Sequence, residues 1–128
     1  MTTTDTNSSG KLTFLRVAAI LASLGAIASP LLALGPLTSS GPLHAMHGMI
    51  GNLNFVLALV AGIAGILWGR ASGNKGLMFH ALSLPVLAVI QIALGEMHLT
   101  MVHIVLGFVY LIAAVSLFTL ALRKPAAA

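Results

Sequence analysis

Five histidines stand in or beside long apolar segments, and two of them share a local pattern. His47 is followed by Gly51, and His103 is followed by Gly107. On a helix, residues four apart lie on the same face, so each imidazole would stand one turn from a position without a side chain. A haem can be held by histidine nitrogens, and a glycine lets a flat macrocycle approach the backbone. The pattern predicts one b-type haem bound between two helices by His47 and His103.

An ordinary structural explanation of the same residues stays open. Glycine is common in membrane helices because it permits close packing, and a histidine near a helix end can reach interfacial water. Against this, an ionisable side chain inside a membrane is costly and marks a candidate functional site. His44 stands one turn before His47 on the same face, where it would flank the macrocycle, bind a propionate or contact water.

Imidazole and thioether groups also gather near the same ends of these segments. Such ligands suit copper, and methionine favours Cu(I), although methionine is also an ordinary apolar residue. The sequence therefore predicts haem b and keeps copper as an alternative. The residues of the copper alternative are Met46, Met49, Met97, His98 and Met101.

Most classes of enzyme are excluded by composition. The chain has no cysteine, so disulfides, iron–sulfur clusters and thiolate metal sites are ruled out. Asp5 and Glu96 are its only acids, which leaves no carboxylate pair for acid–base catalysis. Any chemistry would have to come from a bound cofactor, and we expect no independent catalytic activity.

The elements that position these residues are four apolar runs. Of the 128 residues, 59% are hydrophobic and 6% are charged, too few charges to cover a protein surface in water. The runs span 13–36, 43–68, 77–97 and 100–122, each near the ~20 residues that cross a bilayer. They predict an all-α, four-helix transmembrane bundle over 13–124, with a disordered cytoplasmic tail at 1–12 and a short tail at 125–128.

Three breaks separate the runs. Residues 38–42 predict a turn in which Pro42 opens the next helix. Residues 70–76 predict a polar loop. The third break, 96–100, is so short that the last two helices must form an antiparallel hairpin.

The cations predict the orientation. Cytoplasmic loops of membrane proteins carry an excess of Lys and Arg, and all six cations of this chain fall on one side of a four-span topology. We therefore expect a multi-pass protein of a bacterial plasma membrane with both termini in the cytoplasm. The net charge of +4 is too small for a nucleic-acid surface. The six are Lys11, Arg16, Arg70, Lys75, Arg123 and Lys124.

The two halves of the chain resemble each other weakly. An Ala-Leu-Gly sequence occurs at 33–35 and 93–95, and a His-x-x-x-Gly sequence follows at 47–51 and 103–107. Two similar hairpins in the same orientation predict a two-fold internal repeat about an axis along the membrane normal.

The residues Gln91-Ile92-Ala93-Leu94-Gly95 followed by His103, together with His47 opening the second run, resemble the haem A synthase family. The resemblance covers about one four-helix half of such a chain, from residue 13 onward, and implies a haem b with His47 and His103 as axial ligands. His44 stands where the catalytic half of the family has Glu, and Gly48 where it usually has Arg, so the cofactor-holding half is the closer match. The chain is also similar to small actinobacterial four-helix membrane proteins of unknown function.

A function without a cofactor is a further alternative. Small size, short loops and many small residues suit a structural subunit that docks on a larger respiratory or other membrane complex. A homodimer would bring together two such four-helix halves.

Within the helices, Asn54 and Gln91 would either hydrogen-bond between helices or contact the edge of the haem.

Overall fold

In the computed structural model, which describes residues 3–33 and 41–124, the chain forms four helices. Each is long and apolar enough to cross a membrane. The predicted all-α architecture with four spans is therefore confirmed. The helices are α1 (Thr3–Ala33), α2 (Pro42–Ser72), α3 (Lys75–Glu96) and α4 (Thr100–Leu122).

The first helix starts earlier than the sequence predicted. α1 begins at Thr3, so most of the stretch expected as a disordered tail is helical. The reason is that no proline occurs before Pro30, and a long apolar span nucleates a helix that polar residues can then extend. Residues 34–40, which hold most of the first predicted turn, and the predicted tail 125–128 lie outside the described residues. Pro42 opens α2, as expected.

The predicted polar loop at 70–76 is largely helical, which corrects that prediction. Only Gly73 and Asn74 separate α2 from α3. Gly73 ends α2 with φ 73°, a left-handed conformation that glycine adopts without strain. The side-chain oxygen of Asn74 then accepts a hydrogen bond of 3.0 Å from the backbone N–H of Leu77 and so caps the start of α3. A two-residue turn replaces the loop because both helix ends are capped within it.

The predicted hairpin of the last two helices is present. Residues 97–99 connect α3 to α4, with His98 in the left-handed region at φ 56°. The backbone N–H of Leu99 donates to the carbonyl of Leu94 at 3.0 Å, which closes the turn. This tight turn sets α4 antiparallel to α3.

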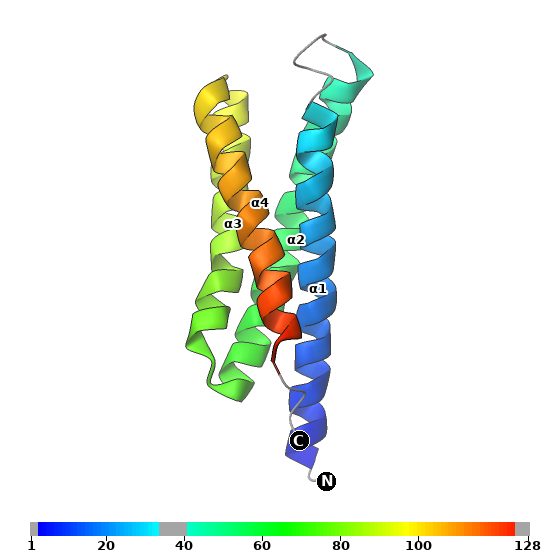
Figure 1. Ribbon diagram of the computed structural model, residues 1–128, viewed down its shortest axis with the longest axis vertical. Coiled ribbons are helices and arrows are strands. Elements are labelled where there is room, and N and C mark those ends of the chain that lie inside the picture. The colour runs from blue at the N-terminus through cyan, green and yellow to red at the C-terminus, as the bar shows by residue number, and fades with distance from the viewer. Residues whose placement is uncertain (1–2, 34–40, 125–128) are drawn as a thin grey trace.

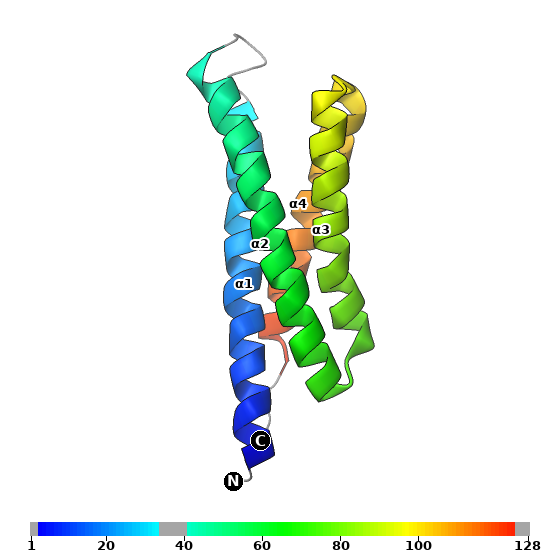
Figure 2. The ribbon, with the colours of Figure 1, turned by 180° about the vertical axis from the view of Figure 1, so that it is seen from behind.

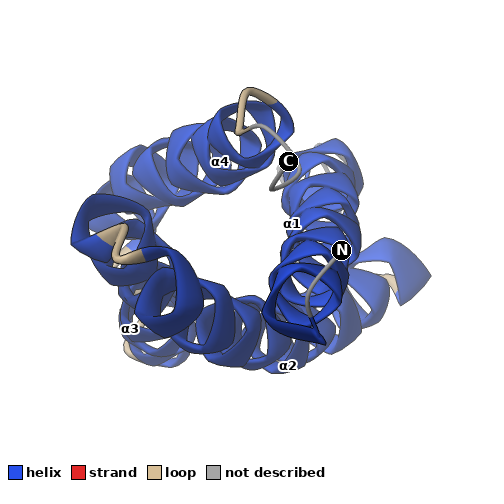
Figure 3. Ribbon diagram, turned by 90° about the horizontal axis from the view of Figure 1, so that it is seen from below, coloured by secondary structure: helices blue, strands red, loops and turns tan. Residues whose placement is uncertain are grey.

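The helices form a ring around the bundle axis (Figure 3), in which each described helix packs its backbone against its two neighbours and α2 lies across the ring from α4. Figures 1 and 2 show the start of α1, the end of α4 and the Gly73 turn together at one end, here called the closed end. The turn at 97–99 and the start of α2 lie at the opposite, open end, toward which the α1–α2 and α3–α4 pairs diverge.

Small residues pack the half of the bundle toward the closed end. Gly65 of α2 lies so close to α3 that a Cβ there would overlap the side chain of Ala81. At Gly69 a Cβ would stand 2.6 Å from the Cβ of Met78. Helices approach this closely only where side chains are nearly absent, as is usual in membrane bundles. This packing fixes α2 against α3.

Polar contacts join α1 to α4. The hydroxyl of Ser23 is buried and lies 2.9 Å from the carbonyl oxygen of Ala114. Nearer the closed end, Arg16 donates from Nε to the carbonyl of Ala121 at 3.1 Å and from Nη2 to that of Lys124 at 2.6 Å. A cation at the C-terminal end of a helix satisfies free carbonyls and complements the helix dipole. Arg16 therefore caps α4.

Candidate functional site

A cavity of about 480 Å³ lies between the diverging helix pairs, and residues of all four helices line it. Its volume is in the range of pockets that hold cofactors and other small ligands. The buried core stops at its floor, which Ala26, Asn54, Ala88 and Tyr110 form. All five residues predicted for haem binding line this one cavity. They are His44, His47, Gly51, His103 and Gly107.

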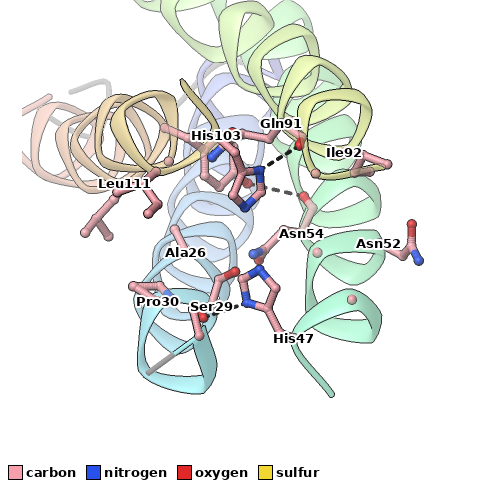
Figure 4. Close-up of a pocket in the computed structure, with 18 of the residues that line it drawn as sticks. Ala26, Ser29, Pro30, His47, Asn52, Asn54, Gln91, Ile92, His103 and Leu111 are labelled. Carbon is pink, nitrogen blue, oxygen red and sulfur yellow. Dashed lines mark hydrogen bonds between the residues drawn. The ribbon is translucent and has the colours of Figure 1, made fainter. Parts of the chain in front are cut away.

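His47 and His103 meet across the interior. They come from α2 and α4, which lie across the ring of helices from each other, and their ring centres are 5.9 Å apart. The planes of the two imidazoles are inclined by 78°. Figure 4 shows the rings facing each other across the cavity. The sequence had predicted this pairing from the His-x-x-x-Gly pattern that the two residues share.

Each of these rings is held by a hydrogen bond to the preceding helix. Nδ1 of His47 lies 3.0 Å from the carbonyl oxygen of Ser29 in α1, and Nδ1 of His103 lies 3.0 Å from that of Gln91 in α3. A carbonyl can only accept, so Nδ1–H must be the donor in both rings. In the tautomer with the proton on Nδ1, Nε2 keeps its lone pair. In Figure 4 the second nitrogen of each ring is on the side that faces the other ring.

The two glycines predicted to lie beside the haem differ in their surroundings: the helix face at Gly51 is open, and the helix face at Gly107 is covered. A Cβ at Gly48 or Gly51 of α2 would meet no other described atom within 4 Å. At Gly107 of α4, a Cβ would stand 2.6 Å from Nε2 of Gln91. The side-chain amide of Gln91 therefore covers the face of Gly107, which the sequence did not indicate.

Two amides of the cavity wall have a buried oxygen without a partner among the described residues, Oδ1 of Asn54 and Oε1 of Gln91. The other end of the Asn54 side chain joins two helices, since Nδ2 donates to the carbonyl of Gly25 at 3.1 Å. The hydroxyl of Tyr110 donates to the backbone carbonyl of Asn54 at 3.3 Å. Asn54 thus hydrogen-bonds between helices, one of its two predicted roles. Buried acceptors without a donor are rare and suit a site that a ligand completes.

The mouth of the cavity is at the open end. His44 and Thr100 lie on its rim and are exposed, and Glu96 is the one charged residue among the described lining residues. No Lys or Arg is among them. The charge at the mouth is therefore that of a single carboxylate.

The five residues of the copper alternative lie outside the described lining of the cavity. All of them are exposed on the outer side of the open end, with His98 in the turn between α3 and α4. Among the described residues, no three His, Cys, Asp or Glu side chains come close enough to hold a metal ion together. The five are Met46, Met49, Met97, His98 and Met101.

His80 lies apart from the cavity, in the half toward the closed end. Its Nε2 donates to the carbonyl of Ala113 in α4 at 2.8 Å. This bond uses the ring nitrogen opposite to the one that His47 and His103 use. His80 therefore acts as a link between α3 and α4.

Sequence reasoning missed the groups that hold the ligand candidates in place. The carbonyls of Ser29 and Gln91 have no signature in the sequence, because every residue carries a carbonyl. Gly95 also contributes, since a Cβ there would stand 3.4 Å from Cε1 of His103. A glycine at that position lets the imidazole lie against α3, a contact that the sequence did not indicate.

Comparison with known protein families, curated proteins and solved structures finds no match to this chain.

Proposed function

We propose that this chain is a small integral membrane protein that holds one haem b between His47 and His103 and serves in electron transfer or haem handling. The observation that carries the proposal is the pair of imidazoles 5.9 Å apart in one cavity, each with Nδ1 bonded to a carbonyl. An imidazole nitrogen lies ~2 Å from a metal that it binds. With ~1 Å more from nitrogen to ring centre, two imidazoles in line on one metal have centres ~6 Å apart.

The chain's own residues would orient and enclose the ligand. The bonds from Nδ1 to the carbonyls of Ser29 and Gln91 fix both rings and make each Nε2 a better donor to a metal. Gly51 leaves the α2 face open to a flat ring. A bound haem would supply one-electron transfer, which the side chains themselves cannot.

The apolar wall suits the body of a macrocycle, and the mouth suits its polar edge. Ile104, Phe108 and Leu111 of α4 contribute apolar side chains to the lining of the cavity. His44 on the rim would face a propionate. Because Glu96 repels a carboxylate, we expect the propionates on the side of the mouth away from it.

A spectrum of the purified protein tests the proposal. We expect a Soret band and sharp reduced α and β bands in mild detergent, directly or after haem is added. His47→Ala and His103→Ala should each abolish this low-spin spectrum. His98→Ala and His80→Ala, which alter histidines outside the described cavity lining, serve as controls and should retain it. Full haem content in both single variants would refute the proposal, and a featureless wild-type spectrum after haem addition would favour a structural subunit without cofactor.

We also propose that the closed end faces the cytoplasm and the cavity opens toward the outer face. All six Lys and Arg lie in the half of the chain's helices toward the closed end or at that end, which supports this orientation. The chain has no cysteine, so single cysteines can report the topology. In intact bacterial cells, a membrane-impermeant maleimide should label Met101→Cys and leave Ser72→Cys unlabelled; the reverse pattern would overturn the orientation.

A further inference from the structure

Gln91 contacts the candidate ligand pair in two ways. Its backbone carbonyl accepts the Nδ1–H of His103 at 3.0 Å. Its side chain reaches α4, where Nε2 stands 2.6 Å from the place of a Cβ on Gly107. Gly107 is one turn along α4 from His103, so the amide covers the helix face beside that ring. One residue therefore holds the histidine through its backbone and covers the neighbouring glycine with its side chain.

The two walls of the cavity differ because of this side chain. Gly51 of α2 would tolerate a Cβ with no described atom of another element within 4 Å, whereas at Gly107 of α4 a Cβ would stand within that distance of two side-chain atoms of Gln91. A flat ring between the histidines would find the α2 wall open and the α4 wall covered. The covering amide must move before such a ring can lie against Gly107.

Few interactions hold the side-chain amide of Gln91 in this position. Oε1 of Gln91 is buried and has no hydrogen-bond partner among the described residues. No hydrogen bond would be broken at that oxygen if the side chain turned away. The backbone carbonyl that holds His103 would stay in place.

We propose that Gln91 is a positioning residue whose amide covers Gly107 in the empty cavity and swings aside when the haem macrocycle enters. This inference rests on the proposed function. Part of the free energy of haem binding is then spent on moving this one flexible side chain. Gln91 therefore lowers the affinity of the protein for haem. It also decides how closely the ring can approach α4.

The covered face can be tested without haem, because Gln91 is the only glutamine in the chain. Protein labelled with ¹⁵N-glutamine shows a single side-chain NH₂ group by NMR in detergent micelles. Gly107→Ala should shift this signal, since a methyl group would occupy the place of the amide. Gly51→Ala is the matched control and should leave it unchanged. If Gly107→Ala leaves the signal in place, the amide does not cover Gly107 and the inference is wrong.

The swing is tested by haem titration followed at the Soret band. Gln91→Ala should bind haem about two- to tenfold more tightly than wild type, the change that corresponds to ordering one flexible side chain. Ile90→Ala, an exposed neighbour on α3, is the control and should bind as wild type does. Equal or weaker binding by Gln91→Ala overturns this inference alone. Failure of the wild type to bind haem overturns the proposed function and, with it, the swing.

Discussion

Replacing Asn54 with leucine measures what a buried amide oxygen costs this bundle. Asn54 is 4% exposed, its Nδ2 donates to the carbonyl of Gly25, and its Oδ1 has no partner among the described residues. A hydrogen bond between membrane helices contributes only ~0.6 kcal/mol on average. A buried acceptor without a donor costs ~1–3 kcal/mol. Leucine has nearly the same shape and removes both, so the free energy of unfolding should rise by about 1 kcal/mol.

The assay is unfolding by SDS in mixed detergent micelles, followed by circular dichroism. The bond from Tyr110 is no complication, because it goes to the backbone carbonyl of residue 54. Asn52→Leu changes an exposed amide on the same helix and should alter the free energy of unfolding by less than ~0.5 kcal/mol. A loss of more than ~1 kcal/mol for Asn54→Leu would refute the reasoning, since it would mean that Oδ1 is hydrogen-bonded in the folded protein.

Three further predictions concern the packing that supports the cavity. Gly65→Val should destabilise the bundle by at least ~2 kcal/mol in the same assay, because its side chain would overlap Ala81; an unchanged midpoint would contradict the close packing of α2 on α3. Arg16→Met keeps the aliphatic stem but removes the cap of α4, and should cost about 1–2 kcal/mol; Arg123→Met, at an exposed site, should cost less than ~0.5 kcal/mol. His80→Ala should lower stability by about 1 kcal/mol while leaving haem binding intact; loss of the Soret band would link His80 to the site.

The number of spans could be predicted from the sequence because lipid imposes a simple rule. A run of about 20 apolar residues satisfies its backbone only as a helix, so all four helices were expected close to where they occur. Their ends were harder to place. α1 reaches back to Thr3 and α2 on to Ser72, because polar residues extend a helix that the apolar span has already nucleated.

The candidate site could be predicted only in outline. The shared His-x-x-x-Gly pattern predicted that His47 and His103 would lie together, and both line one cavity. The covering of Gly107 by Gln91 was not predictable, because it depends on the distance and crossing of α3 and α4. The same holds for the bond from His47 to Ser29, which depends on how α1 lies against α2. Periodicity gives the face of a helix, whereas contacts between helices are a property of the assembled bundle.

The unequal packing of the two halves has a consequence for protein engineering. Near the closed end, glycines such as Gly65 and Gly69 lie between α2 and α3 and have no side chain that could change rotamer or be shortened by substitution. The positions of the two helices there are therefore fixed by close contact of the glycine backbone. Residues of the cavity wall can then be exchanged while the helices keep their alignment. Substitutions at Ile104 and Leu111 would change the shape offered to a ligand. The chain is thus a compact scaffold in which synthetic porphyrins or other metal complexes could be accommodated within a membrane by redesigning the open half alone.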